Sequence, residues 1–276
     1  MALTPAHAEA GLRLSAEAGW NQTAADWRLM LELGEGVGQV TSAGELVASA
    51  LIVPYGGRLA WIAMVLTAKR WQRRGLATRN LRAMIARCDA LGLVAGLDAT
   101  PDGRPVYAPQ GFRDAFPLQR LVAREPRRMG RLPAVDLRPF TETDLHVAVG
   151  LDAATFGAPR PEVLRRLLAG RPKQAWIALA DHRIAGFVLA RTGRLTLHLG
   201  PLVAERAEVA IALASRALEG GGGPVSIDVP DRQAAFLDAL VGRGFLPVRP
   251  FMRMLRSEQT FGDPARLFAL AGPELG

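Results

Sequence analysis

Along the first half of the chain, the spacing of apolar residues predicts one helix followed by three short strands. Trp27, Met30 and Leu31 recur at helical spacing and predict a helix from Ala24 to Leu33. Three mainly apolar runs come next, with the turn sequences TSAGE and YGGR between them. The predicted strands are Val37–Val40, Leu46–Pro54 and Leu59–Leu66. Because tight turns of this kind join neighbouring antiparallel strands, we expect a meander.

A second helix and two further strands are predicted up to Val122. The apolar face of this helix carries Leu81, Met84, Ile85, Cys88 and Leu91. Gly92 is placed to end it. A strand is then predicted from Leu93 to Ala99, and a last strand opens at Phe112.

The second half of the chain repeats this order of elements. The sequence PEVLRRLLA and the residues before it are predicted to be helical, and the apolar stretch after it predicts three strands joined at residues 181–183 and 192–194. A helix over 205–219, a strand in VSIDVPD, a helix over 233–241 and a final strand after Gly244-Phe245 complete the series. Two segments, GLDATPDGRPVYAPQGF and SIDVPDRQAAFLDALVGRGF, share strand, aspartate, helix and Gly-Phe in the same order. We therefore expect an internal structural repeat.

The sequence REPRRMGRLP, from Arg124 to Pro133, is charged, holds two prolines and a glycine, and lacks apolar periodicity. It predicts a linker between two domains. The expected organisation is an N-terminal domain over 1–125, a linker over 126–133, a second domain over 134–257 and a tail over 258–276. The fold class that we expect is α+β with a mixed sheet, each domain being a mostly antiparallel sheet flanked by helices.

Composition narrows the class of protein. The chain has 276 residues, is 49% hydrophobic and carries a formal net charge of +8, which solubility or an anionic partner (nucleotide, acidic lipid or DNA) would explain. The single cysteine, Cys88, forms no disulfide within the chain, and the four histidines lack metal-ligand spacing. No signal peptide and no apolar run of membrane-spanning length is evident. We expect a cytoplasmic protein that binds neither metal nor membrane.

The sequence KRWQRRGLATRN, from Lys69 to Asn80, indicates an anion site. It lies between a predicted strand and a predicted helix, whose first N–H groups lack internal partners and carry partial positive charge. Gly75 lets the backbone approach an anion closely, Arg73 and Arg74 add full charges, and Thr78 adds a hydroxyl. A Walker loop would end in Gly-Lys-Ser/Thr, and a dinucleotide fingerprint would need three glycines, so neither motif is present.

Two motifs together resemble the GNAT (GCN5-related) N-acetyltransferase superfamily over roughly residues 9 to 123. The acyl-CoA loop of that family reads Gln/Arg-x-x-Gly-x-Gly/Ala, and QRRGLA, residues 72–77, fits it position by position. The family also places a tyrosine four residues before Gly-Phe, as Tyr107 stands before Gly111-Phe112. The chain departs from the pattern at Lys69, where the family often has proline, and in TPDGRPV, which lacks the common asparagine.

The resemblance implies acetyl-CoA as co-substrate, no metal, and direct attack of an amine from a small molecule or peptide on the acetyl carbonyl. It implies that the pantetheine arm contacts Val65, Leu66 and Thr67. It implies that the diphosphate is held by Gln72, Arg73, Arg74, Gly75, Leu76, Ala77 and Thr78. Tyr107 would be the general acid that protonates the departing thiolate. The general base is open, with Glu45 or Asp98 acting through water as suggestions.

The sequence GWNQTAADW, residues 19–27, is the predicted acceptor side. In this family the segment around the first helix lines the acceptor cleft, so Trp20, Asn21, Gln22 and Trp27 are predicted to contact the substrate. Tryptophan faces and amide groups suit an amine-bearing small molecule. A helix cap with packing tryptophans explains the same residues equally well.

The second half resembles a divergent acetyltransferase-like domain, on the sequences FGAPR, GPLVA, IDVP, Gly244-Phe245 and RML. Where the first half has its basic loop, the second has AERAEVA, whose Glu205 and Glu208 would repel a diphosphate. Leu240 stands at the position of Tyr107. We expect a non-catalytic or substrate-binding domain. Its polar groups, with cleft or structural roles, are Arg191, His198, Asp228 and Arg253.

Other functions remain open. One is an acyl-CoA-responsive binding or regulatory protein without turnover. Nucleic-acid binding is disfavoured because no basic helix is interleaved with aromatic residues. The expected partner is a small-molecule amine, with a homodimer left open.

Overall fold

The computed structural model describes residues 1–127, 134–219 and 221–276, and the chain divides into two compact units. The first unit comprises Met1–Arg113, Gly193–Leu195 and Met254–Glu258. The second comprises Asp114–Thr192, Thr196–Arg253 and Gln259–Gly276. Most of the predicted linker, residues 128–133, lies outside the described residues, so the domain bounds given above stay a prediction.

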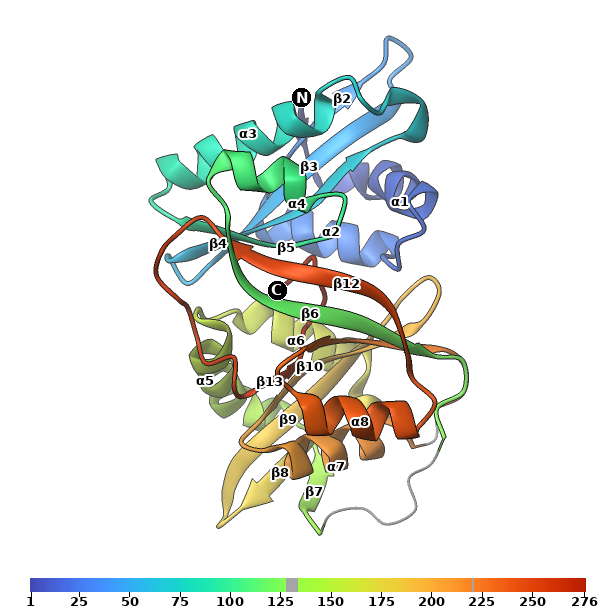
Figure 1. The fold of residues 1–276 in the computed structure, drawn as a ribbon, viewed down its shortest axis with the longest axis vertical. Coiled ribbons are helices and arrows are strands. Elements are labelled where there is room, and N and C mark those ends of the chain that lie inside the picture. The colour runs from blue at the N-terminus through green and yellow to red at the C-terminus, as the bar shows by residue number, and fades with distance from the viewer. Residues whose placement is uncertain (128–133, 220) are drawn as a thin grey trace. The chain divides into compact units, whose positions relative to one another are not determined.

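The first unit is a mixed sheet with the strand order β1-β2-β3-β4-β5 (Figure 1). Its strands are β1 Ala2–Leu3, β2 Glu35–Val40, β3 Leu46–Tyr55, β4 Leu59–Thr67 and β5 Val94–Ala99. Neighbours from β1 to β4 pair antiparallel, whereas β5 runs parallel to β4. The α-helices are α1 Ala8–Glu17, α2 Ala24–Leu33, α3 Leu76–Ala90 and α4 Arg104–Tyr107. Short 3-10 turns cover Pro5–His7, Lys69–Trp71 and Ala108–Gln110.

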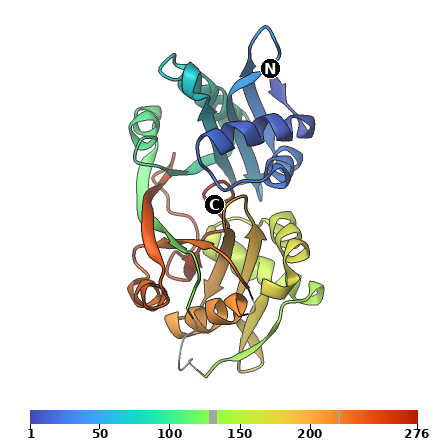
Figure 2. The same ribbon diagram turned by 90° about the vertical axis from the view of Figure 1, so that its right-hand side faces the viewer.

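Helices cover both faces of this sheet, with α1 and α2 on one face and α3 on the other (Figure 2). Strand β3 is accordingly buried along almost its whole length. Helix α2 begins at Ala24 because Thr23 and Asp26 form a reciprocal cap. The Thr23 side chain accepts from the Asp26 amide at 3.3 Å, and the Asp26 carboxylate accepts from the Thr23 amide at 2.6 Å.

The second unit has the strand order β12-β6-β11-β10-β9-β8-β7, and β13 pairs with β10 outside this path. Its strands are β6 Arg113–Ala123, β7 Asp136–Pro139, β8 Trp176–Ala180, β9 Arg183–Thr192, β10 Leu197–Ala204, β11 Val225–Pro230, β12 Leu246–Leu255 and β13 Leu267–Ala269. Its helices are α5 Leu145–Phe156, α6 Pro161–Gly170, α7 Ala207–Leu218 and α8 Ala234–Gly242. Short 3-10 turns cover Glu142–Asp144 and Pro172–Gln174.

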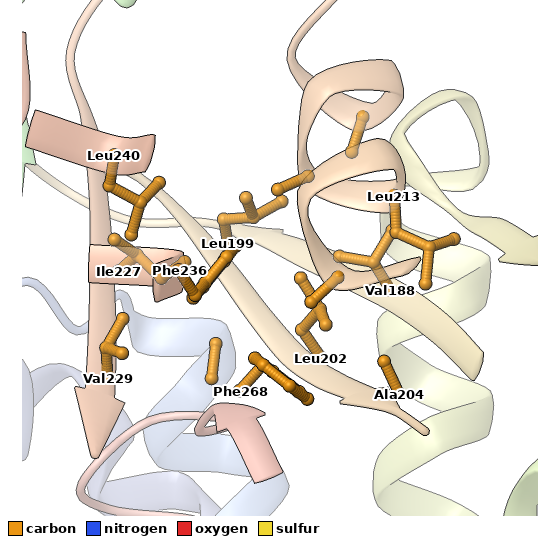
Figure 3. Close-up of a cluster of buried hydrophobic side chains, with 14 of the residues drawn as sticks. Val188, Leu199, Leu202, Ala204, Leu213, Ile227, Val229, Phe236, Leu240 and Phe268 are labelled. Atoms are coloured by element: carbon orange, nitrogen blue, oxygen red, sulfur yellow. The ribbon is translucent and has the colours of Figure 1, made fainter. Parts of the chain in front are cut away.

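A cluster of buried apolar side chains joins strands and helices of the second unit (Figure 3). Leu199 and Leu202 of β10, Ile227 of β11 and Leu213 of α7 belong to it. Phe268 of β13 also belongs to this core, and its ring meets the Phe236 ring of α8 edge to face, with centroids 5.6 Å apart. Strand β13 is therefore part of the folded core.

Truncating Phe268 to alanine is expected to destabilise the protein by about 3–5 kcal/mol, because it empties a site inside a close-packed core. Chemical denaturation of the variant measures this loss. Leu246→Ala is the control, since that side chain is 64% exposed and its removal should change stability by less than about 0.5 kcal/mol. Equal effects of the two substitutions would contradict the packing role of β13.

Strand β6 belongs mainly to the second unit, although it continues the sequence of the first repeat. It pairs antiparallel with β11, from Leu118 opposite Pro230 to Ala123 opposite Val225. Conversely, residues Met254–Glu258, at the end of β12 and beyond it, belong to the first unit. There the Arg256 amide donates to the Ala95 carbonyl of β5 at 2.8 Å. Each unit therefore includes chain from both halves of the sequence.

The predicted fold class is confirmed, and so is the repeated order of elements. The series β2-β3-β4-α3-β5-α4 in the first repeat corresponds to β8-β9-β10-α7-β11-α8 in the second. Gly111 and Gly244, the glycines of the two Gly-Phe pairs, both adopt a positive φ, of 89° and 87°. Helix α1 and strand β13 are not among the predicted elements, and β13 lies in the segment expected to be a tail.

In the part of the chain that the structure describes, no helix combines the length and apolarity that a bilayer crossing requires.

Candidate functional site

Strand β4 separates from β5 before either strand ends. The parallel ladder joins Leu59 to Val94 and ends with Trp61 opposite Gly96, whereas β4 continues to Thr67. The pairing of β4 with β3 also shifts register between Ala63 and Leu66. Met64 adopts a φ of +49° at this irregularity, which re-aims the backbone of the following residues. The predicted pantetheine-contacting residues, Val65 to Thr67, are those that follow the bulge.

A hydroxyl on the neighbouring strand holds this bulge. Ser49 of β3 is fully buried, and its hydroxyl donates to the Met64 carbonyl at 2.8 Å. A left-handed conformation is costly for a residue such as methionine, so a specific hydrogen bond that fixes it contributes to the shape of the strand. The sequence carries no signal of this contact, because a serine in an apolar strand is compatible with many environments.

The basic loop, residues 68–75, leads from β4 into α3. Gly75 is the N-cap residue of α3, with a φ of +75°, and an added Cβ would meet no atom within 4 Å. No side chain among the described residues caps this helix. The first N–H groups of α3 therefore receive no side-chain cap, as an anion site at a helix N-terminus requires.

Positive charge surrounds this helix end. Arg73 and Arg74 are exposed and make no ion pair within the described residues, and the Arg74 guanidinium lies 4.7 Å from the centre of the Trp71 ring. Arg70 forms an exposed ion pair with Glu45. The Gln72 side-chain amide donates to the Thr67 carbonyl at 3.3 Å, which ties the loop back to the end of β4. Two arginines thus remain available to an anionic ligand.

Tyr107 ends α4, in the segment that follows β5. Its half-buried ring meets Phe112 edge to face at 6.1 Å, and it lies so close to Gly103 that a Cβ there would be 2.7 Å from the ring. Burial raises the pKa of Tyr107 to about 12, so the phenol is protonated at any physiological pH. Since β4 and β5 are parallel neighbours, the basic loop and the Tyr107 segment both leave the sheet at the carboxyl edge of its strands.

The predicted acceptor residues occupy different environments. Trp27 is fully buried, its indole N–H donates to the Ser15 hydroxyl at 3.0 Å, and its ring leaves no room for a Cβ at Gly11. This placement gives Trp27 a packing role between α1 and α2. Trp20 is half-buried, while Asn21 and Gln22 are buried.

Asn21 is held by the segment Gly193–Leu195, which belongs to the same unit. Its side-chain carbonyl accepts from the Leu195 amide at 2.8 Å, and its backbone carbonyl accepts from the Arg194 amide at 2.8 Å. An added Cβ at Gly193 would overlap the Asn21 amide, at 2.1 Å from its nitrogen. Sequence reasoning could not find this contact, because the two segments are more than 170 residues apart. The Gln22 side-chain oxygen, in contrast, is buried without a hydrogen-bond partner among the described residues.

The two suggested bases differ in setting. Glu45 is exposed and paired with Arg70, whereas Asp98 lies half-buried on β5. Neither environment identifies the residue as a general base, so both assignments remain predictions.

In the second unit, the corresponding strands lead into a different loop. Strand β10 ends at Ala204 and α7 begins at Ala207, so only residues 205–206 connect them. Glu208 lies in the first turn of α7, and Glu205 pairs with Arg183. Leu240, which stands where the first repeat has Tyr107, is buried in the apolar core. The connection between β10 and α7, which the structure describes in full, has no counterpart of the Gly75 loop.

The four polar residues predicted for the second repeat are all buried. Asp228 accepts two hydrogen bonds from Arg120, at 2.7 and 2.8 Å, and its carboxylate lies 3.9 Å from His198 Nδ1. His198 Nε2 donates to the Leu270 carbonyl at 3.1 Å. Arg191 pairs with Glu274, and the Arg253 guanidinium lies 5.2 Å from the Phe116 ring. These residues form a buried network around the segment that begins with β13.

Burial lowers the pKa of His198 to about 4, against the pull of the Asp228 carboxylate. Between about pH 6.5 and 4, His198 is protonated in the unfolded chain but stays neutral in the folded one. The free energy of unfolding should therefore decrease as the pH falls through this range, by about 2 kcal/mol at pH 5. Denaturant unfolding between pH 7 and 4.5 measures this slope. His198→Gln removes the titration and should flatten the profile; an unchanged slope would contradict the assignment.

Family models match both repeats. The model described as "Acetyltransferase (GNAT) family" matches residues 13–112, and the one described as "Acetyltransferase (GNAT) domain" matches residues 148–269.

Curated relatives and solved structures agree with these matches. The chain is 28% identical over 240 residues to the uncharacterized N-acetyltransferase YitH of Bacillus subtilis (strain 168), covering 87% of this chain and 84% of the relative. It is 26% identical to the holothin acyltransferase of Pseudoalteromonas sp. (strain SANK 73390), covering 84% and 78%. A putative acetyltransferase from Pyrococcus horikoshii has the same fold, with a TM-score of 0.79 at 20% identity over 100% of this chain and 95% of that one.

Proposed function

Since the chain belongs to the GNAT acetyltransferase superfamily, with two family domains in tandem, and is an acyltransferase, we propose that its first repeat transfers an acetyl group from acetyl-CoA to an amine. The observation that carries this proposal is the uncapped N-terminus of α3 at Gly75, in the loop that follows the bulged strand β4. The acceptor is an amine of a small molecule or peptide. The lone, buried Cys88 fits a reducing compartment, for which we propose the cytoplasm.

The loop and the strand end would hold the two parts of the coenzyme. The backbone N–H groups of residues 72–78 would bind the diphosphate, with Arg73 and Arg74 adding charge. The backbone of Val65, Leu66 and Thr67, turned by the bulge where β4 leaves β5, would pair with the amide groups of the pantetheine arm. Acetyl-CoA supplies the activated acetyl group, and these residues of the chain orient it.

Tyr107 would serve as the acid. The amine nitrogen forms a bond to the acetyl carbon, the carbon–sulfur bond breaks with its electron pair leaving on sulfur, and water or a base removes a proton from the new amide nitrogen. The departing thiolate would accept a hydrogen bond from the Tyr107 phenol and take its own proton from water. Because the pKa of Tyr107 is about 12 and that of an ordinary thiol is ~8.5, complete transfer to a free thiolate would be unfavourable. We therefore expect the phenol to donate a strong hydrogen bond as sulfur leaves, which stabilises the developing charge.

Gln22 is the residue that we propose to bind the acceptor amine. Its buried side-chain oxygen has no hydrogen-bond partner in the described part of the chain, and such an atom is costly to bury unless a ligand satisfies it. An amine N–H is a suitable donor. Trp20 is half-buried next to it, whereas Trp27 is left out of the proposal because it is fully buried.

Release of the free thiol from acetyl-CoA tests the proposal directly. The protein is incubated with acetyl-CoA and a panel of primary amines, and the released thiol is followed with a thiol reagent. We expect amine-dependent release that saturates with acetyl-CoA. Cys88 is buried and its pKa is raised to about 11, so it should add little background. Calorimetry that finds no acetyl-CoA binding would refute the proposal, and binding without turnover on any amine would favour a regulatory acyl-CoA-binding protein.

A further inference from the structure

We propose that the segment Leu267–Gly276 occupies, in the second unit, the place that acyl-CoA takes in the first, so that the second unit binds its own chain and the protein binds one acyl-CoA. The location of acyl-CoA in the first unit rests on the function proposed above.

The two units build this place in the same way. In the first, the parallel ladder of β4 and β5 ends at Trp61, and the register with β3 shifts between Ala63 and Leu66. In the second, the parallel ladder of β10 and β11 ends at His198 opposite Ser226, and the register of β10 with β9 shifts between Leu199 and Leu202. Both strand pairs therefore separate just before a bulge in the strand that leads to the following helix.

Only the second unit fills the gap with its own backbone. Strand β13 pairs antiparallel with β10, with Ala269 opposite Leu202, and it also contacts β11. The next residue, Leu270, bridges the two separated strands: its amide donates to the Asp228 carbonyl of β11 at 3.0 Å, and its carbonyl accepts from His198 of β10 at 3.1 Å. These hydrogen bonds resemble those expected between a pantetheine arm and the end of β4.

The fit around Leu270 is tight. Gly200 lies at the β10 bulge with a φ of +149°, and an added Cβ there would come within 1.9 Å of the Leu270 carbonyl oxygen. Figure 3 shows Phe268 between Val229 of β11 and Leu202 of β10, inside the apolar cluster. A second ligand cannot share this space with the segment.

Buried polar contacts fix the segment at several points. The Gln233 side-chain amide donates to the carbonyls of Ala265 and Leu267, both at 2.9 Å. Arg191 pairs with Glu274, and Arg160 donates to the Leu275 carbonyl at 2.8 Å while Asp152 holds it by two hydrogen bonds. Breaking such buried charged contacts leaves uncompensated charge, so the segment should leave only when the unit unfolds.

The described connection between β10 and α7 also lacks the anion site that the first unit has between β4 and α3. Residues 205–206 are too few to form a loop like residues 68–75, and Glu208 places negative charge in the first turn of α7. An acyl-CoA molecule would thus lose the diphosphate contacts and meet an occupied strand gap.

Calorimetry with acetyl-CoA gives the stoichiometry. We expect one molecule bound per chain, with affinity at least 100-fold weaker in Gly75→Glu, by about 3 kcal/mol of added charge repulsion. Two molecules per chain, of which Gly75→Glu abolishes one, would overturn this inference and leave the proposed function intact. One molecule whose binding Gly75→Glu does not change would instead remove the proposed coenzyme site.

Whichever stoichiometry calorimetry gives, thiol labelling tests whether the segment Leu267–Gly276 stays in its place in the second unit. Ala269→Cys and Leu270→Cys each place a thiol on a segment that is fully buried, Leu246→Cys places one at a position 64% exposed, and the parent chain with buried Cys88 is the blank. We expect both segment variants to react at least 100-fold more slowly than Leu246→Cys, and saturating acetyl-CoA to leave their rates unchanged. Labelling as fast as that of Leu246→Cys, or labelling accelerated by acetyl-CoA, would show that the segment vacates its place and would overturn the inference.

Discussion

Replacing Gly75 by glutamate is expected to weaken acetyl-CoA binding by at least about 100-fold, because a negative charge about 5 Å from the diphosphate costs ~3 kcal/mol at an effective dielectric constant of about 20. The open space around Gly75 means that the side chain itself clashes with nothing in the free protein. Its positive φ adds a modest backbone strain. Isothermal titration calorimetry measures the affinity, and thermal unfolding verifies that the fold persists.

Gly92 offers a matched control for this substitution. It has a φ of +68°, no atom within 4 Å of an added Cβ, and a position after the opposite end of α3. Gly92→Glu therefore imposes the same strain and the same charge away from the basic loop, and should leave binding unchanged. Gly75→Lys separates charge from bulk, since it should bind more tightly than Gly75→Glu. Equal losses in Gly75→Glu and Gly92→Glu would contradict a diphosphate site at the start of α3.

Replacing Tyr107 by phenylalanine is expected to lower kcat by about 10²–10⁴-fold while leaving acetyl-CoA affinity nearly unchanged, which is the usual range for losing a positioned proton donor. The ring contacts with Phe112 and Gly103 survive the change, so the packing should not suffer. Tyr55→Phe is the control. It removes the hydroxyl of the other tyrosine, a buried residue of β3, and should leave kcat unchanged.

The pH dependence gives a second test of Tyr107. Because burial raises its pKa to about 12, the phenol keeps its proton while the amine substrate loses one with rising pH. The value of kcat/KM should therefore rise with pH and reach a plateau without a descending limb up to about pH 10. Tyr107→Phe should lower the whole profile by one factor. Normal turnover of Tyr107→Phe across this range would remove the tyrosine from the mechanism.

Local patterns were sufficient to predict most of the elements. Helix α2 spans Ala24–Leu33 as the spacing of Trp27, Met30 and Leu31 indicates, and the three meander strands match to within two residues. The glycine at the start of α3 was also predictable, because a basic loop with one glycine between strand and helix specifies a backbone conformation. A single sequence therefore predicts those elements whose conformation depends on neighbouring residues in the chain.

Features determined by distant chain were not predictable. Nothing in the residues of β13 distinguishes a strand that pairs with β10 and contacts β11 from the tail that we expected, since the paired residues Ala269 and Leu202 are far apart in the sequence. The bulge at Met64 depends on Ser49 of another strand, and the placement of Asn21 depends on Gly193–Leu195. Trp27 shows the same limit, because its spacing fits a packing residue and a substrate contact equally well.

The assignment of β6 to the second unit has a consequence for how this chain can evolve and be dissected. A fragment that stops near Glu125 would carry β6 without β11, the strand that it pairs with. Expressed alone, it should aggregate through that exposed strand edge, and co-expression with the remainder should rescue it. A copy that has lost its own chemistry would then be retained as an obligatory folding partner of the copy that keeps it.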